Sequence, residues 1–180
     1  RNKWSTKYLS EPMSIIKKFI FVIFITVFVN ETYADEIKKL GTHKDWETYV
    51  VKSDTGKMCF AQSKPVLQAP KKNFREARLF ISFRPNEKVT DEISITSGYV
   101  YNKKNSITAK SGKNKYKFDM TTENFAWMAD NNQEKKMIKT MKKGSRIMIT
   151  AYNLKGSQTI DHYSLLGFTK AYKATKANCS

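Results

Sequence analysis

Histidine and cysteine are both scarce in this chain, which leaves few groups for metal or nucleophilic chemistry. The 180 residues include two histidines and two cysteines, and neither His43 nor His162 neighbours a cysteine, so no zinc-binding spacing is present. The chain also lacks the G-x-S-x-G, phosphate-loop and dinucleotide motifs. Asp161 and His162 are adjacent in an expected strand, whose alternation would place them on opposite faces and prevent a proton relay. We therefore expect no metal, no cofactor and no enzymatic activity.

No apolar run is long enough to cross a bilayer, which takes about 20 residues. The longest run, residues 19–29, holds eleven residues and is interrupted only by Thr26. It follows Lys17 and Lys18, and the small residues Thr32 and Ala34 come after it. This order is typical of a secretory signal peptide, although an uncleaved anchor is the alternative.

The signal-peptide interpretation divides the chain into three parts. We expect a signal peptide at residues 13–34, cleaved near Ala34, and a single domain at residues 35–180 that is periplasmic or secreted. Residues 1–12 show no pattern, and we interpret them as translated sequence upstream of a start at Met13.

Acidic residues are outnumbered two to one. Without residues 1–34, 28 Lys or Arg and 14 Asp or Glu remain, a formal net charge of +14. Such a surface attracts anions, so the expected partner is an anionic envelope or host-surface component. Only four of these cations are Arg, the residue that base and phosphate recognition favours, so no specific nucleic acid is expected. A solvated lysine surface without a ligand is the alternative.

The two cysteines, Cys59 and Cys179, lie 120 positions apart near the two ends of the expected domain. An even pair in an exported protein predicts a disulfide, and two buried free thiols are the alternative. A bridge would remove both residues as candidate nucleophiles.

Apolar residues after position 45 mostly alternate with polar ones, the pattern of half-buried strands. Residues 35–45 are polar and read as a loose lead-in, and residues 64–75 contain two prolines and read as a loop. Gly98 predicts a bulge or a close backbone approach. The expected strands lie at residues 46–52, 57–63, 77–84, 92–99, 116–120, 146–152 and 159–166, with Met120 on the same face as Tyr116 and Phe118. The basic stretch at 103–115 offers one more short strand, around Ile107 and Ala109.

The period changes to that of a helix at two places. Residues 130–132 can cap a helix that runs to Lys143 and ends at Gly144. A second short helix begins near Phe168. The fold class is therefore mainly β, an antiparallel β-sandwich of about eight strands with two short helices and one disulfide.

Several segments in order resemble the invasion-associated locus B family of exported bacterial proteins. They are ISFRP at 81–85, EISITSGY at 92–99, FAWMAD at 125–130, MIKTMKKG at 137–144 and YSLLGFTKAY at 163–172, ahead of Cys179. The resemblance covers residues 46–179. It implies a signal peptide, a periplasmic or surface location, a compact β-rich sandwich and an association with host-cell invasion. It implies no catalytic residues.

Two basic segments are the candidate anion-binding residues. On the helix, the lysines fall on the face away from Met137, Ile138 and Met141, so they form either a binding ridge or a solvated face. Phe125, Trp127 and Met128 belong either to the core or to an exposed aromatic platform. The candidate cations are Lys71, Lys72, Arg75, Arg78, Lys135, Lys139, Lys142 and Lys143.

These observations favour an exported, non-enzymatic binding or envelope-accessory protein that recruits an anionic partner through its Lys-rich surface. A periplasmic structural or stress-protective protein without a specific ligand is the first alternative. An enzyme with an unrecognised site is the second, and the oligomeric state is open.

Overall fold

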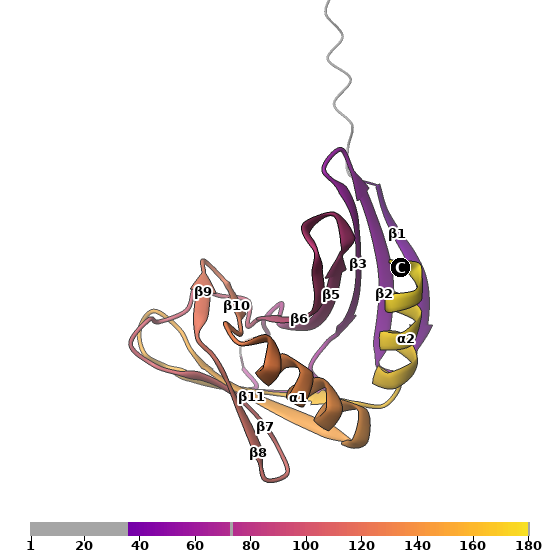
Figure 1. The fold of residues 1–180 in the computed structure, drawn as a ribbon. Coiled ribbons are helices and arrows are strands. Elements are labelled where there is room, and N and C mark those ends of the chain that lie inside the picture. The colour runs from indigo at the N-terminus through magenta and orange to yellow at the C-terminus, as the bar shows by residue number, and fades with distance from the viewer. Residues whose placement is uncertain (1–35, 73, 180) are drawn as a thin grey trace, which may run out of the picture. The chain divides into compact units, whose positions relative to one another are not determined.

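Alternating apolar residues form two antiparallel sheets in the computed structural model, which describes residues 36–72 and 74–179 (Figure 1). These residues belong to one compact unit. The upstream segment 1–12, the predicted leader 13–34 and its cleavage point near Ala34 lie outside the described residues.

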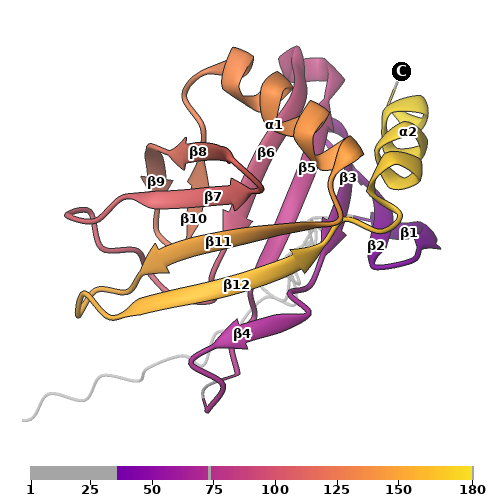
Figure 2. The same cartoon turned by 90° about the horizontal axis from the view of Figure 1, so that it is seen from below.

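The first sheet has seven strands and the second has five. In spatial order, the first sheet consists of β1 (Glu36–His43), β2 (Trp46–Ser53), β3 (Gly56–Ser63), β5 (Arg78–Arg84), β6 (Val89–Thr96), β10 (Phe125–Trp127) and β9 (Met120–Thr122). The second consists of β4 (Leu67–Ala69), β12 (Gln158–Ser164), β11 (Arg146–Tyr152), β7 (Ile107–Ser111) and β8 (Asn114–Phe118). The strands β11 and β12 run across β5 and β6 (Figure 2).

Two helices and a short 3₁₀ turn complete the fold: α1 (Asn131–Lys143), α2 (Phe168–Asn178) and η2 (Pro85–Glu87). Helix α1 contacts β6 and β8, whereas α2 contacts β2 and β3. The mainly β class, the two antiparallel sheets and the two helices confirm the fold predicted from the sequence.

The core lies where the inward faces of the two sheets meet the apolar sides of the helices. On β5, Leu79, Ile81 and Phe83 are buried, as their alternation predicted. Trp46 on β2 is completely buried, and its indole Nε1 donates a hydrogen bond to the Ser164 carbonyl oxygen at 3.0 Å. Its ring lies 4.9 Å from that of Phe168, centroid to centroid. This one side chain therefore connects both sheets with α2.

Helix α1 begins and ends where its sequence predicts. The Asp130 carboxylate accepts a hydrogen bond from the Asn132 backbone N–H at 2.8 Å, which caps the first turn. At the other end, the Gly144 N–H donates to the Thr140 carbonyl oxygen. Met137, Ile138 and Met141 are buried, so the lysines of the helix face outward.

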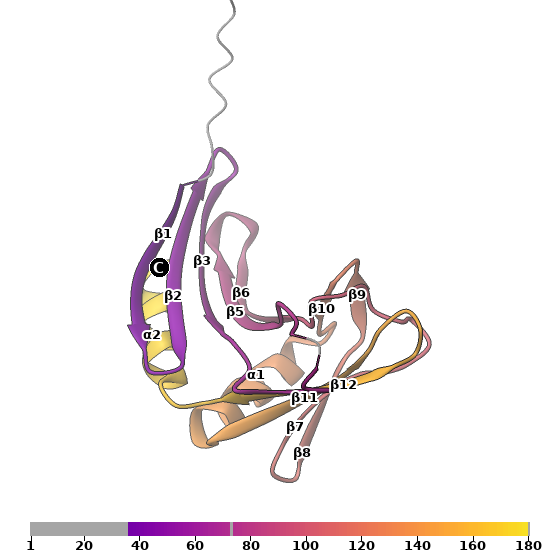
Figure 3. The ribbon, with the colours of Figure 1, turned by 180° about the vertical axis from the view of Figure 1, so that it is seen from behind.

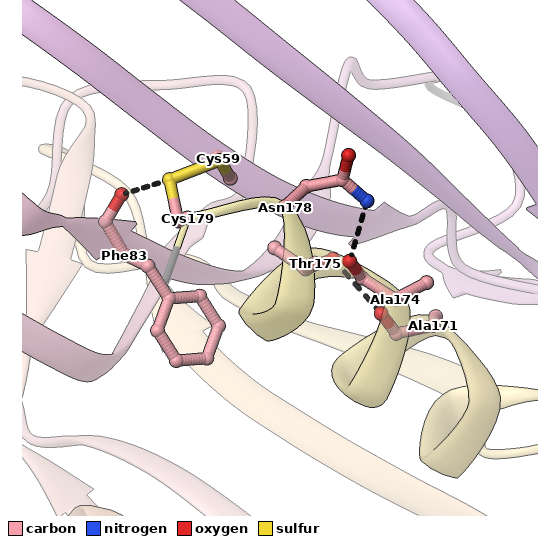
Figure 4. The surroundings of a disulfide bond; sticks show 7 residues. All are labelled: Cys59, Phe83, Ala171, Ala174, Thr175, Asn178 and Cys179. Atoms are coloured by element: carbon pink, nitrogen blue, oxygen red, sulfur yellow. Dashed lines mark hydrogen bonds between the residues drawn. A yellow bond between two sulfur atoms is a disulfide. The ribbon is translucent and has the colours of Figure 1, made fainter.

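The predicted disulfide is confirmed between Cys59 on β3 and Cys179 just after α2 (Figure 4). The two Cα atoms lie 5.8 Å apart, and both side chains are buried. The Cys179 sulfur lies 3.6 Å from the Phe83 carbonyl oxygen on β5. The bridge attaches the end of α2 to the first sheet, and it leaves neither cysteine free to act as a nucleophile.

The expectation of a loose lead-in at residues 35–45 was wrong, because residues 36–43 form β1, an edge strand of the first sheet (Figure 3). The strand pairs with β2 through backbone hydrogen bonds, for example with Ile37 opposite Val51. Most of its side chains are exposed. Burial therefore leaves no alternating signal in its sequence.

Together with β1, three more strands raise the total in the described residues from the expected eight to twelve. Strand β4 lies inside the expected loop at residues 64–75, and β9 and β10 form a short hairpin. Met120 was wrongly placed with Tyr116 and Phe118: it is 51% exposed, whereas the other two are buried. The Asp119 N–H bonds to the Trp127 carbonyl oxygen, so the chain turns between β8 and β9 and the alternation breaks.

Two glycines sit where a side chain would collide with the backbone. A Cβ on Gly98 would lie 2.8 Å from the Glu76 backbone nitrogen, which confirms the predicted close approach. Gly167 has a φ of +90°, and its Cβ would lie 1.8 Å from the His43 carbonyl oxygen. This contact packs the start of α2 against the β1–β2 turn.

Across the described ranges, no helix has the length and apolar character needed to cross a membrane.

Candidate anion-binding surface

The eight candidate cations lie in two groups, and five of them line two different hollows. Lys71, Arg75 and Arg78 line a hollow of about 320 Å³ beside β4. Lys139 and Lys143 line a hollow of about 840 Å³ at the end of α1.

Arg75 is occupied by a buried ion pair with Asp161 of β12. Its guanidinium donates to both oxygens of the Asp161 carboxylate, at 3.0 Å for Nη1, and also to the Ser97 carbonyl oxygen at 3.0 Å. The side chains are only 9% and 1% exposed. Burial raises the pKa of the Asp161 carboxyl, and the Arg75 charge opposes that shift. Arg75 therefore anchors the β4–β5 segment to the second sheet, and its charge is already balanced.

The other three candidate cations of this segment differ in whether an acid balances their charge. Arg78 pairs with Glu76 at 2.6 Å and donates to the Ala77 carbonyl oxygen at 2.9 Å. Lys71 and Lys72 are exposed, and within residues 36–72 and 74–179 neither forms an ion pair. Of the four candidates here, only the two lysines keep an unbalanced charge.

The cations at the end of α1 lie in different surroundings. Lys139 and Lys143 share their hollow with Arg146, the first residue of β11. All three are exposed, and none forms an ion pair within the described part of the chain. The remaining lining residues carry no carboxylate; they are Ser111, Gly112, Asn114, Thr140, Gly144, Ser145 and Leu166.

The backbone at the end of α1 offsets only part of this positive charge. A helix C-terminus carries roughly half a negative charge, which falls off within the last turn. Three full positive charges line the hollow. The local field is therefore positive and suits an anionic group.

Lys135 and Lys142 lie on the same helix but outside the hollow. Lys135 is exposed. Lys142 turns toward α2, and its Nζ lies 3.7 Å from the centroid of the Tyr172 ring. Burial lowers the pKa of Lys142. Lys142 thus joins the two helices through a cation–π contact.

Sequence reasoning did not name Arg146 as a site residue. Its only available signal was its position two residues after Gly144, which ends α1. Because β11 starts at once, Arg146 returns to the side of Lys143, as the shared hollow shows.

The inner face of α1 carries an acid that the sequence analysis did not single out. Glu134 is 4% exposed, and its carboxylate accepts a hydrogen bond from the Ile93 backbone N–H of β6 at 2.8 Å. Burial raises the pKa of Glu134 to about 7, which the hydrogen bond from Ile93 only partly opposes. Unlike Asp161, this buried acid faces no cation in an ion pair within the described residues.

The candidate platform residues Phe125, Trp127 and Met128 divide between the surface and the core. Met128 is buried in the core, whereas Phe125 and Trp127 are half-buried on the opposite face from the buried Ala126. There they extend a row of rings across the sheet with neighbouring centroids 5.1–6.1 Å apart. The row consists of Tyr49, Phe60, Phe80, Phe125 and Trp127.

Within residues 36–72 and 74–179, neither histidine belongs to a cluster suited to metal binding. Asp161 is buried against Arg75, and the neighbouring His162 is half-buried, with its Nδ1 lacking a hydrogen bond. In the described ranges, no three His, Cys, Asp or Glu residues gather closely enough to hold a metal ion.

The sequence of this fold matches a known family. A family model described as Invasion associated locus B (IalB) protein matches residues 46–176. The chain belongs to this family. The match begins at Trp46, the buried residue that connects the two sheets, and it includes all eight candidate cations and Arg146. It leaves out β1 and Cys179. No curated protein and no solved structure is significantly similar to the chain.

Family membership confirms the resemblance that the sequence motifs indicated, and at family level it associates the chain with invasion. IalB membership does not name a ligand. The surface chemistry of this chain is therefore the basis for proposing a partner.

Proposed function

We propose that this IalB protein is an exported, non-enzymatic binding protein that recruits an anionic partner through the hollow at the end of α1. The observation that carries the proposal is the lining of that hollow: Lys139, Lys143 and Arg146, with no carboxylate. The partner is an anionic component of the bacterial envelope or of a host surface, met in the periplasm or outside the cell.

The lining of the hollow favours a polar polyanion over an apolar ligand. Ser111 donates its hydroxyl to the Arg146 carbonyl oxygen at 2.8 Å, and the Thr140 hydroxyl bonds with the Tyr116 hydroxyl at 2.7 Å. Asn114 and Ser145 are exposed beside the cations. Phosphate, sulfate or carboxylate groups would meet positive charge and polar side chains there.

Two features support a binding role rather than catalysis. The hollow contains no His, Asp, Glu or Cys, so it offers no acid–base pair or thiol nucleophile. Both cysteines are consumed by the Cys59–Cys179 bridge. The bridge also supports export, because disulfides persist mainly in oxidising compartments.

The test measures the binding of the purified protein to soluble polyphosphate, a polyanion without an acyl chain, at low and at high salt. The variant Lys139→Glu/Lys143→Glu/Arg146→Glu should lose about tenfold or more in affinity. A matched control, Lys52→Glu/Lys57→Glu/Lys155→Glu, has the same change in net charge on exposed residues outside the hollow. It should retain most of the binding.

Binding by the unmodified protein should weaken sharply as salt rises, because exposed charges are screened. An equal loss in both triple variants would contradict the proposal, since net charge alone would then explain the binding. Absence of binding at low salt would also contradict it.

A further inference from the structure

The hollow beside β4 gathers exposed apolar side chains in a way that the hollow at α1 does not. Eight large hydrophobic side chains are exposed in the described part of the chain, and three of them line this hollow: Val66 (53% exposed), Leu67 (40%) and Phe74 (80%). Pro65 completes the apolar wall. Solvent-exposed apolar groups that cluster around one hollow mark an interaction site more strongly than scattered ones do.

Lysines surround these apolar residues. Lys64 and Lys71 line the hollow, and the exposed Lys72 follows directly in the chain. None of the three forms an ion pair across residues 36–72 and 74–179, and no carboxylate lines the hollow. Glu76, an acid of the same segment, pairs with Arg78. The rim therefore carries a net positive charge.

Hydrogen bonds fix the backbone of this segment, and they hold its apolar side chains at the surface. The Val66 N–H donates to the His162 carbonyl oxygen at 2.8 Å, and β4 pairs along the outer edge of β12 (Figure 2). The Gln68 side chain donates to the Arg75 carbonyl oxygen at 3.0 Å and accepts from the Arg75 N–H at 3.2 Å. These two bonds close the loop between β4 and Arg75.

We propose that the β4 hollow docks on a membrane surface that contains anionic lipids. Phe74, Val66 and Leu67 enter the boundary between headgroups and acyl chains, while Lys64, Lys71 and Lys72 face the headgroups. Attachment of this kind depends on buried apolar area together with attraction to anionic lipid. Unpaired lysines act as point charges without a fixed fork geometry, which suits a laterally mobile headgroup layer better than one directional partner.

Vesicle sedimentation tests the proposal with two probes, phosphatidylcholine alone and phosphatidylcholine mixed with phosphatidylglycerol. The unmodified protein should bind the mixed vesicles and bind phosphatidylcholine alone only weakly. Phe74→Ser should lower binding to the mixed vesicles about tenfold or more, because the apolar insertion is lost. Leu154→Ser is the matched control, since Leu154 is 67% exposed but lies outside this hollow. It should bind like the unmodified protein.

The lysines have their own matched pair of variants. The variant Lys71→Glu/Lys72→Glu should bind the mixed vesicles more weakly, by at least about fivefold for each lysine replaced. Lys52→Glu/Lys57→Glu, on the β2–β3 hairpin, should lose much less.

Insertion itself can be detected with Phe74→Trp, which keeps an aromatic ring at this position. Its fluorescence, taken as a difference from the unmodified protein, should shift to the blue on mixed vesicles and be quenched by brominated acyl chains. Unshifted, unquenched fluorescence would overturn the proposal, as would equal binding by Phe74→Ser and the unmodified protein. Self-association that Phe74→Ser abolishes, without vesicle binding, would assign the hollow to a second copy of the chain instead.

This proposal stands apart from the one made for α1. Phe74→Ser should still bind polyphosphate, and the Lys139/Lys143/Arg146 charge-reversal variant should keep the blue shift of Phe74→Trp on mixed vesicles. Either proposal can therefore be contradicted while the other holds.

Discussion

The β4–β5 segment and the end of α1 are both basic in sequence, yet the arginines of the first and the cations of the second have opposite surroundings. Arg75 and Arg78 are bound by Asp161 and Glu76. Lys139 and Lys143 have no such partner in the described residues and share a hollow with Arg146. Equal local charge can therefore serve either to join two sheets or to attract a ligand. The position of the acids decides which.

Two buried acids of the molecule also differ in their surroundings. Asp161 faces a guanidinium that binds both its oxygens, whereas Glu134 faces only a backbone N–H. A buried carboxylate without a cation resists ionisation, which explains why the pKa of Glu134 rises to about 7. Substitutions at these acids and at the exposed lysines should therefore differ in size and in pH dependence.

The largest difference in stability should follow Asp161→Ala. The change leaves the buried Arg75 charge without its partner, which costs about 3–5 kcal/mol of the free energy of unfolding. Lys139→Ala on the exposed face of α1 should change it by no more than about 0.5 kcal/mol. Urea denaturation of the two variants and the unmodified protein measures both. A loss below about 1 kcal/mol for Asp161→Ala would show that Arg75 finds water or another partner.

An intermediate effect with a distinct pH dependence is expected for Glu134→Gln. In the unmodified protein, the raised pKa means that the folded state loses stability as pH rises from about 4.5 to about 7, because the buried carboxyl must ionise. The amide can still accept from the Ile93 N–H but does not ionise. The variant should therefore gain about 2–3 kcal/mol on the unmodified protein between pH 4.5 and pH 8.

Urea denaturation at the two pH values provides the measurement for Glu134. Asp161→Asn is the contrasting variant, because it should destabilise at both pH values by weakening the pair with Arg75. A pH-independent difference between Glu134→Gln and the unmodified protein would mean that Glu134 is ionised normally.

The smallest effect should separate two lysines on the same helix. Lys142→Ala removes the cation–π contact with Tyr172 and should cost about 0.5–1 kcal/mol. Lys135→Ala, on an exposed side chain with no such contact, should be nearly neutral. Thermal unfolding at equal ionic strength compares the two. Equal midpoints for both variants would rule out a contribution from the contact.

The strands that the sequence predicted correctly are those with one buried face. On β5 and β11, burial of Leu79, Ile81 and Phe83 and of Ile147, Ile149 and Ala151 matches the alternation of apolar residues in the sequence. Strand β1 shows no such alternation, because its pairing with β2 uses backbone groups that every sequence possesses. The three residues of β4 are likewise defined by the neighbouring β12 rather than by their own pattern.

The candidate sites were predictable only as segments. The helix period placed the lysines of α1 away from Met137 and Met141, as the structure confirms. It could not select Lys139 and Lys143 over Lys142, because Tyr172 comes from a helix about 30 residues later in the chain. Nor could it join Arg146 to them, since that depends on how β11 leaves the helix.

The sequence by itself determined the alternating strands, the two helices, the cysteine pair and the family, because each depends on local pattern or residue order. The tertiary structure alone decided which cations are balanced. Asp161 lies 86 positions from Arg75 along the chain and hydrogen-bonds to its guanidinium only because β12 and the β4–β5 segment meet. Electrostatic partnership depends on distance in space and on burial, and neither is encoded in the local charge of a segment.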